Sequence, residues 1–176
     1  MGLILLIVLM TFGGLIGSYV VLATNQSLEW KPFNLPFQIW ISTALIIISS
    51  ILYEIAKKNL LAGNQVKAGK WFLLTSVLGS IFIASQILSW LNLVRLGYYA
   101  SGNPYAGFFY ILTAVHAAHV LGGIISLTYI VLKTRIITSD EEELLKRQWF
   151  ATVVGWYWHF MGALWLILFL LLGFYK

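Results

Sequence analysis

Residues 106–132 read AGFFYILTAVHAAHVLGGIISLTYIVL, an apolar stretch that contains two histidines, His116 and His119, and no Asp, Glu, Lys or Arg. The stretch exceeds the about 20 residues that a helix needs to cross a hydrocarbon core of ~30 Å. Ionisable side chains at such a depth are costly, so they indicate a functional site by default. The sequence predicts a membrane-spanning helix that carries two histidines.

Four more stretches of this kind occupy most of the remaining chain, at residues 2–22, 37–55, 71–94 and 150–174. Hydrophobic residues make up 60% of the chain and charged residues 10%, too few charges to cover a water-soluble domain of this size. We expect an all-α polytopic membrane protein, with residues 1–176 forming a single domain of five transmembrane helices. Because the chain has no cysteine, disulfides, thiolate metal sites and thiol catalysis are excluded.

The basic residues are distributed unevenly between the predicted loops. Loops 56–70 and 133–149 lie on one side of the membrane and hold eight basic residues, whereas the other side has three. The eight are Lys57, Lys58, Lys67, Lys70, Lys133, Arg135, Lys146 and Arg147, and the three are Lys31, Arg95 and Lys176. The positive-inside rule therefore predicts a cytoplasmic N-terminus and a C-terminus on the outer side of the membrane.

The segment Ser139-Asp140-Glu141-Glu142 resembles a capping box that opens a helix before the last apolar stretch. Glu142 and Lys146, and likewise Glu143 and Arg147, stand at the i,i+4 spacing that favours ion pairs on one helix face. We therefore expect the fifth helix to begin about two turns before the membrane.

Two rows of residues at four-residue spacing indicate helix packing. One row consists of Ala114, Ala118, Gly122 and Ser126 on the fourth helix, and the other of Gly155, His159 and Ala163 on the fifth. Small side chains let a second helix approach closely, so we expect both rows to face protein. At ~1.5 Å per residue, His116 and His159 both fall ~14–15 Å from the ends of their spans, which predicts one shared layer of histidines.

The three histidines have two interpretations. Neutral imidazole is a common metal ligand, so His116, His119 and His159 could form a metal or haem site. Alternatively, they are structural and hydrogen-bond to Thr, Ser, Tyr, Trp or a backbone carbonyl on a neighbouring helix, since no carboxylate is expected at their depth. Glu54 is the only acidic residue within a span, and we interpret it as an interfacial cap near Lys57 and Lys58.

The strings FFYILTAVHAAHVLGGIISL at 108–127 and GWYWHFMGALWLILF at 155–169 together resemble subunit III of haem–copper respiratory oxidases. That family has a helix with the pattern Thr-Gly-x-His-x-x-His-Val-x-x-Gly, followed by a last helix with Trp-Tyr-Trp-His-Phe-x-Asp-x-x-Trp. Matching residues are Thr113, His116, His119, Val120, Gly123, Trp156, Tyr157, Trp158, His159, Phe160 and Trp165, and Gln86 matches a family glutamine in the third helix. The five spans resemble the short bacterial form without the two N-terminal helices of the seven-span form.

The resemblance implies a non-catalytic accessory subunit of a bacterial terminal oxidase in the aerobic respiratory chain, located in the bacterial inner (plasma) membrane with its C-terminus in the periplasm. Such a subunit packs against the catalytic subunit I and other subunits and has no catalytic centre of its own, the haems and copper being held by its partners. Family members bind phospholipid in a cleft formed with their first two helices. Here we expect lipid or a neighbouring subunit to fill that space, and no cofactor or metal to bind the chain itself.

This sequence departs from the family pattern at three acidic positions. Gly162 stands where the last helix has Asp, Ser89 stands where the third helix has Glu, and Ile7 aligns with a buried glutamate of the first helix. The chain therefore resembles a diverged branch whose histidines have different partners. Two other functions remain open: the accessory subunit of a nitric oxide reductase, and a small haem-binding or quinone-interacting membrane protein that uses His116, His119 and His159.

Overall fold

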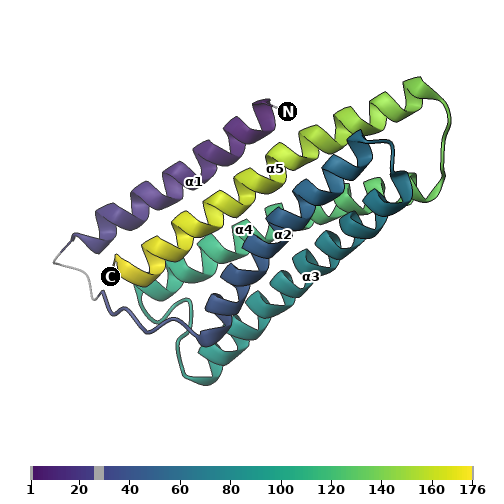
Figure 1. The fold of residues 1–176 in the computed structure, drawn as a ribbon. Helices are drawn as coiled ribbons and strands as arrows, with labels where there is room; N and C mark the ends of the chain where they lie inside the picture. Colours follow the sequence, from purple (N-terminus) through teal and green to yellow (C-terminus); the bar gives the residue numbers. More distant parts are fainter. Residues whose placement is uncertain (1, 26–29, 176) are drawn as a thin grey trace.

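A computed structural model describes residues 2–25 and 30–175 of the chain, and it is helical apart from short loops (Figure 1). The helices are α1 (Gly2–Ala23), α2 (Phe37–Leu61), α3 (Gln65–Arg95), α4 (Pro104–Arg135) and α5 (Glu141–Phe174). All five are long and apolar enough to cross a membrane. The prediction of an all-α protein with five transmembrane helices is confirmed. The predicted domain range includes Met1, residues 26–29 and Lys176, which lie outside the described residues.

Helices α2 to α5 all extend beyond the apolar stretches that predicted them. α2 continues to Leu61, α3 begins at Gln65, and only a tight turn joins them, with Gly63 at a φ of +79° that glycine adopts without a steric penalty. Charged residues such as Lys and Glu are good helix formers, so the helices do not stop at the edge of the apolar sequence.

The start of α5 is set by Asp140, whose side chain accepts a hydrogen bond from the Glu142 amide at 3.1 Å. The predicted capping signal therefore acts one residue later than Ser139. Both predicted ion pairs are present, at 2.6 Å between Lys146 and Glu142 and at 3.1 Å between Arg147 and Glu143. The early start of the fifth helix is confirmed.

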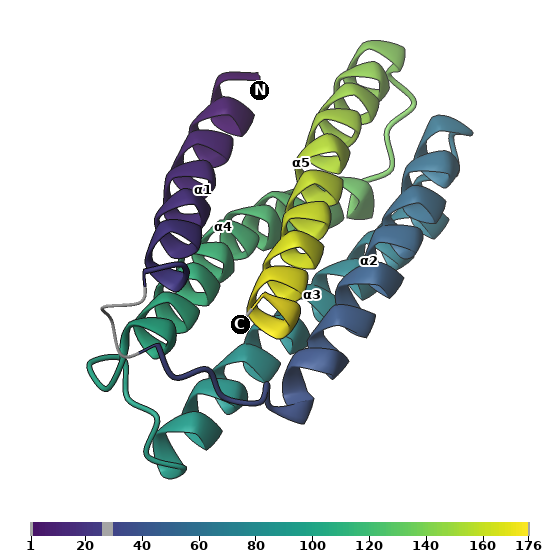
Figure 2. The same cartoon turned by 90° about the vertical axis from the view of Figure 1, so that its left-hand side faces the viewer.

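Helices α2 to α5 form a bundle in which α2 lies between α3 and α5, and α4 packs against both α3 and α5. Helix α1 packs against α4 and stands apart from the bundle, as Figures 1 and 2 show. Few of its side chains are buried, namely Val8, Phe12 and Tyr19. The other faces of α1 are not covered by the described part of the chain.

Aromatic side chains fasten the C-terminal end of α1 to the bundle. The Tyr19 hydroxyl donates to the Tyr175 carbonyl at 2.7 Å, and the Tyr105 hydroxyl donates to the Leu172 carbonyl at 2.6 Å. The Trp30 ring packs edge-on against Tyr19 and Tyr105, with centroids 5.1 and 5.6 Å away. This end of α1 is therefore held by aromatic contacts, and its first half is held by the buried side chains of Val8 and Phe12.

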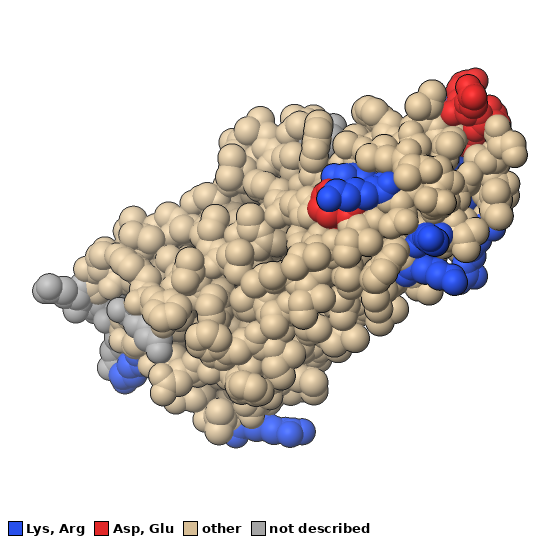
Figure 3. All heavy atoms as spheres, in the orientation of Figure 1, with Lys and Arg blue, Asp and Glu red and all other residues tan. Residues whose placement is uncertain are grey.

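The α2–α3 and α4–α5 connections lie at one end of the molecule, and the α3–α4 connection lies at the other (Figure 1). The eight basic residues of the two predicted loops therefore lie toward this end of the molecule, which is the charged end, and Figure 3 shows acidic atoms at its tip. Of the three remaining basic residues, Lys176 lies outside the described residues. Which end faces the cytoplasm stays a prediction.

Candidate functional site

His116 lies in an aromatic cage in the middle of the protein. It is fully buried, and its ring stands 5.1 Å from Trp165, 5.8 Å from Phe82 and 6.2 Å from Phe12, centroid to centroid. Neither ring nitrogen has a hydrogen-bond partner among the described residues. The predicted hydrogen bond to a neighbouring helix is therefore wrong for His116, because α1, α3 and α5 all present aromatic rings to it.

His119 is half-buried and bonds within its own helix. Its Nδ1 lies 2.7 Å from the Val115 carbonyl, one turn earlier in α4, and its ring packs edge-on against Phe12 at 5.6 Å. The prediction of a partner on another helix is wrong here too. The link to α5 instead runs through the backbone, since the Tyr157 hydroxyl donates to the His119 carbonyl at 2.8 Å.

His159 has the strongest polar contacts of the three histidines. Its Nε2 donates to Glu54 Oε1 at 2.7 Å, and its Nδ1 lies 2.6 Å from the Ser50 hydroxyl. A carboxylate can only accept, so in a neutral ring Nε2 carries the proton and Nδ1 accepts from Ser50. The prediction that no carboxylate lies at this depth is wrong, because helical side chains lean toward the N-terminus and Glu54 on α2 thus reaches back toward His159.

Glu54 also forms an ion pair with Lys57 at 2.6 Å, and this contact agrees with the predicted role of Glu54 as an interfacial cap. It therefore serves two donors, one on its own helix and one on α5. Gly162, where the family pattern has an acid, faces α2 near Ile46 and Ser50. In this chain a carboxylate for His159 comes from α2 instead of from α5.

The histidines do not share one layer. His116 stacks near Trp165, which follows His159 by six residues and so lies ~9 Å further along α5. His159 faces α2, whereas His116 faces the centre between α1, α3 and α5. Among residues 2–25 and 30–175, no three His, Asp or Glu side chains gather as a set of metal ligands.

The other residues of the family pattern join helices through hydrogen bonds. Trp158 Nε1 donates to Ser49 Oγ at 3.2 Å, and Trp165 Nε1 donates to Thr43 Oγ1 at 3.1 Å, both from α5 to α2. Between other helices, Trp90 Nε1 donates to Thr113 Oγ1 at 3.0 Å, and Gln86 Nε2 donates to Ser42 Oγ at 2.8 Å. Trp156 points outward and is exposed.

Sequence reasoning missed the hydroxyls of α2 that receive these bonds. Ser42, Thr43, Ser49 and Ser50 stand in two pairs seven residues apart, which is about two helical turns, so each pair presents hydroxyls to the same neighbours. A buried indole N–H requires an acceptor. A row of hydroxyl residues on one span and tryptophans on another could have predicted these hydrogen bonds between the two helices.

Two of the glycines at which helices approach closely, Gly79 and Gly123, do not belong to the predicted packing rows. A Cβ on Gly79 would stand 2.8 Å from the Trp158 ring, and one on Gly123 would stand 3.0 Å from the same ring. Gly155, a predicted packing residue, does lie against Tyr53, where a Cβ would meet the ring at 2.8 Å. Each of these glycines therefore makes room for an aromatic side chain.

The predicted small-residue row on α4 is mostly uncovered, whereas the row on α5 is uncovered only at Ala163. Ala114, Ala118, Gly122 and Ala163 are exposed, and Ser126 is half-buried. In the α5 row, Gly155 and His159 do face α2, as predicted. The prediction that the α4 row of small residues faces protein is wrong within this chain. The helix turns them outward because the buried face of α4 is taken by Thr113, His116 and Gly123.

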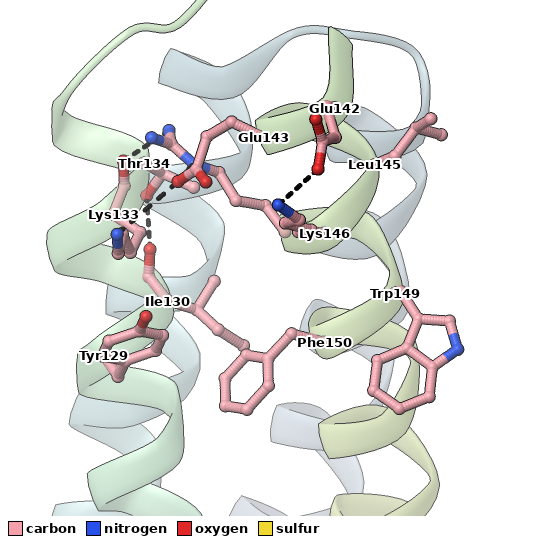
Figure 4. A pocket seen from close by; sticks show the side chains of 11 residues that line it. Tyr129, Ile130, Lys133, Thr134, Glu142, Glu143, Leu145, Lys146, Trp149 and Phe150 are labelled. Atoms are coloured by element: carbon pink, nitrogen blue, oxygen red, sulfur yellow. Dashed lines mark hydrogen bonds and ion pairs between the residues drawn. The ribbon is translucent and has the colours of Figure 1, made fainter. Parts of the chain in front are cut away.

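A cavity of about 740 Å³ opens between α4 and α5 at the charged end of the molecule (Figure 4). Tyr129 and Phe150 form its apolar wall. Lys133 and Lys146 stand at its rim, paired with the lining carboxylates of Glu143 at 3.5 Å and Glu142 at 2.6 Å. At the same end, Arg147 donates to the Lys133 and Ile136 carbonyls, each at 2.7 Å. Arg147 also bonds Glu143, which precedes the apolar part of α5, and this bond lowers the pKa of the Glu143 carboxyl. The sequence analysis did not predict this cavity.

Comparison with known proteins places these features in a family. Residues 4–176 match the family model described as cytochrome c oxidase subunit III. The cytochrome c oxidase subunit 3 of Corynebacterium diphtheriae is 32% identical over 172 residues, which cover 94% of this chain and 82% of that protein. The subunit 3 of Thermostichus vulcanus is 30% identical over 168 residues, covering 92% of this chain and 78% of that protein. A probable subunit 3 of Nocardia farcinica is 29% identical over 165 residues, covering 92% and 79%.

Proposed function

The chain belongs to the cytochrome c oxidase subunit III family, and from this premise we propose that it packs against the catalytic subunit of a bacterial haem–copper terminal oxidase and stabilises it. It is a non-catalytic accessory subunit of that respiratory complex. The observation that carries the proposal is the family match over residues 4–176, nearly the whole chain. The curated relatives favour an oxidase over a nitric oxide reductase, and over a small protein that binds haem or quinone.

The site supports this role because the residues of the family pattern bind helices to one another. The indoles of Trp158 and Trp165 are satisfied by hydroxyls of α2, and Thr113 accepts from an indole of α3. His116 is enclosed by rings with no opening toward a substrate. Such an arrangement builds a rigid bundle for assembly.

The test is to purify the oxidase through an affinity tag on its catalytic subunit, from cells with and without this chain. We expect the chain at about one copy per catalytic subunit, and faster loss of oxygen consumption on incubation when it is missing. Oxidase that purifies without the chain, from cells that express both, would contradict the proposal.

We also propose that the N-terminus and the C-terminus lie on the cytoplasmic and the outer side of a bacterial plasma membrane. The support is the gathering of eight basic residues in the α2–α3 and α4–α5 regions. A reporter that works only in the cytoplasm should be active when inserted at Gly63 and silent when fused after the last residue. The reverse pattern would overturn the orientation.

We further propose that the cavity between α4 and α5 holds an anionic phospholipid. The cations Lys133, Lys146 and Arg147 outnumber the carboxylates Glu142 and Glu143 in the cavity lining, so the net charge suits a phosphate. The apolar lining also contains the aromatic side chains that suit an acyl chain at the membrane interface, namely Tyr129, Trp149 and Phe150. Replacing Lys133 and Lys146 by Gln should lower the amount of anionic lipid that native mass spectrometry finds on the complex. The matched double change at Lys58 and Lys67, which do not line the cavity, should leave it unchanged. Equal loss with both pairs would show only a general charge effect.

A further inference from the structure

A polar cluster lies on the outer surface where α2 meets α5. It consists of Glu54, His159, Ser50 and Lys57, linked by contacts of 2.6 to 2.7 Å. The cluster is only partly covered, because the side chains of Glu54 and His159 are 37% and 35% exposed. Figure 3 shows acidic and basic atoms side by side within an otherwise tan surface, short of the charged end of the molecule.

The two oxygens of the Glu54 carboxylate differ in the hydrogen bonds that they accept. Both His159 Nε2 and Lys57 Nζ donate to the same oxygen, Oε1. The second oxygen, Oε2, receives no hydrogen bond from any residue that the structure describes. An exposed carboxylate oxygen that faced hydrocarbon would be costly, since lipid chains offer no donor.

A shallow apolar groove of about 320 Å³ continues from the cluster along the α2–α5 surface. The walls of the groove are formed by Ile46, Ile47 and Leu166. Between them the groove stays open because Gly162 has no side chain and Ala163 has only a methyl group. Small residues of this kind let a partner helix approach closely in a membrane. The groove can therefore receive a helix, and Glu54 Oε2 beside it can accept a hydrogen bond from that helix.

Two occupants can be compared by charge. The head group of an anionic phospholipid would bring its phosphate near Glu54, whose charge is balanced by Lys57 alone, so the cluster offers no net positive charge. The cavity between α4 and α5 suits a phosphate better, since its lining holds three basic residues against two acidic ones. A protein helix with a hydroxyl, amide, indole or cationic side chain would satisfy Oε2 and cover the groove. The charge of the cluster therefore favours protein.

We propose that the α2–α5 groove is the surface on which the catalytic subunit docks, with one of its transmembrane helices in the groove and a hydrogen-bond donor of that helix on Glu54 Oε2. The proposal rests on the proposed function, and it adds which face of this chain makes the contact.

Site-specific photocrosslinking in the assembled oxidase tests the contact directly. A photoreactive phenylalanine at Ala163, in the groove, should give an adduct with the catalytic subunit. The same residue at Ala84, an exposed position on α3, is the matched control and should give none. An adduct of Ala163 with lipid only, with a second copy of this chain or with another protein would overturn the proposal.

Substitutions test the groove and the cluster separately. Ala163→Trp fills the groove and should reduce the amount of this chain on the tagged catalytic subunit by about tenfold or more, whereas Ala84→Trp should not. Glu54→Gln should also weaken retention, by about tenfold, because an uncharged amide oxygen accepts a hydrogen bond less strongly than a carboxylate. Its control is Glu141→Gln, which removes an exposed carboxylate that lines neither the groove nor the cavity between α4 and α5.

Each variant is first checked as the isolated chain in detergent, by its helical content and its elution as a single species. A variant that passes this check yet stays fully bound to the catalytic subunit contradicts the docking face, as does loss caused by Ala84→Trp alone. If the native chain itself fails to bind the catalytic subunit, the proposed function fails, and the two failures are thereby distinguished.

Discussion

His116 and His159 belong to the same sequence pattern but lie in opposite environments. His116 is enclosed by three aromatic rings and has no polar partner among the described residues, whereas His159 is partly exposed and bonds a carboxylate and a hydroxyl. The first is held by packing and the second by polar contacts. A histidine in a membrane helix can thus be kept in place in two ways, and removing it should have different consequences in each.

The glycines repeat this contrast. Gly79 and Gly123 lie in the interior and admit the Trp158 ring at distances that leave no room for a side chain. In the groove, a Cβ on Gly162 would meet its nearest neighbour, Ile46, at an ordinary 3.8 Å. The interior is closely packed, and the groove has space left.

The largest effect is expected from Gly79→Leu, because its side chain would collide with Trp158 and force the tryptophan away from Ser49. We expect the free energy of unfolding to fall by about 3 kcal/mol. Gly122→Leu is the control, since a Cβ there would meet only the Tyr157 hydroxyl at 3.9 Å. Unfolding of the isolated chain by SDS, followed by tryptophan fluorescence, measures both. Equal effects would show that the two regions are not packed differently.

The second prediction compares the two histidines directly. His159→Leu leaves Glu54 without its donor from α5 and should cost about 1 kcal/mol, less than for a buried charged hydrogen bond because both side chains are more than a third exposed. His116→Leu places an apolar side chain in an apolar cage and should leave the free energy of unfolding unchanged or raise it. The same unfolding assay applies. A larger loss for His116→Leu would mean that His116 has a polar partner after all.

A smaller effect is expected when a single interhelical hydrogen bond is removed. Thr43→Val keeps the shape of the side chain but removes the acceptor of the Trp165 indole. Such bonds in membrane proteins average about 0.6 kcal/mol, and we expect a loss of that order. Thr128→Val removes a hydroxyl that bonds only its own helix on an exposed face, so it should have no measurable effect.

The smallest effect is expected from Ala118→Leu. Ala118 is exposed, two positions from His116 and therefore on roughly the opposite face of α4. The substitution should not change the unfolding of the isolated chain. A clear destabilisation would show that α1 or another helix covers this face and would restore the packing role predicted from the four-residue spacing.

Much of the fold could be predicted from the sequence because lipid imposes a simple condition. An apolar run of about 20 residues has to form a helix, since its backbone groups find no other partners in hydrocarbon. The five spans, the Glu142–Lys146 and Glu143–Arg147 pairs and the early start of α5 follow from local sequence alone. The family motifs also indicated the function, since each motif is a local string.

Burial and partners were decided by the tertiary structure. In a membrane protein both the core and the lipid-facing surface are apolar, so the spacing of Ala114, Ala118 and Gly122 could not reveal that this row faces outward. The pairing of Glu54 with His159 joins residues 105 positions apart, and it depends on how far α2 continues and on its packing against α5. The sequence by itself therefore determined the helices and the family, whereas only their packing decided which histidine is enclosed by rings and which one meets a carboxylate.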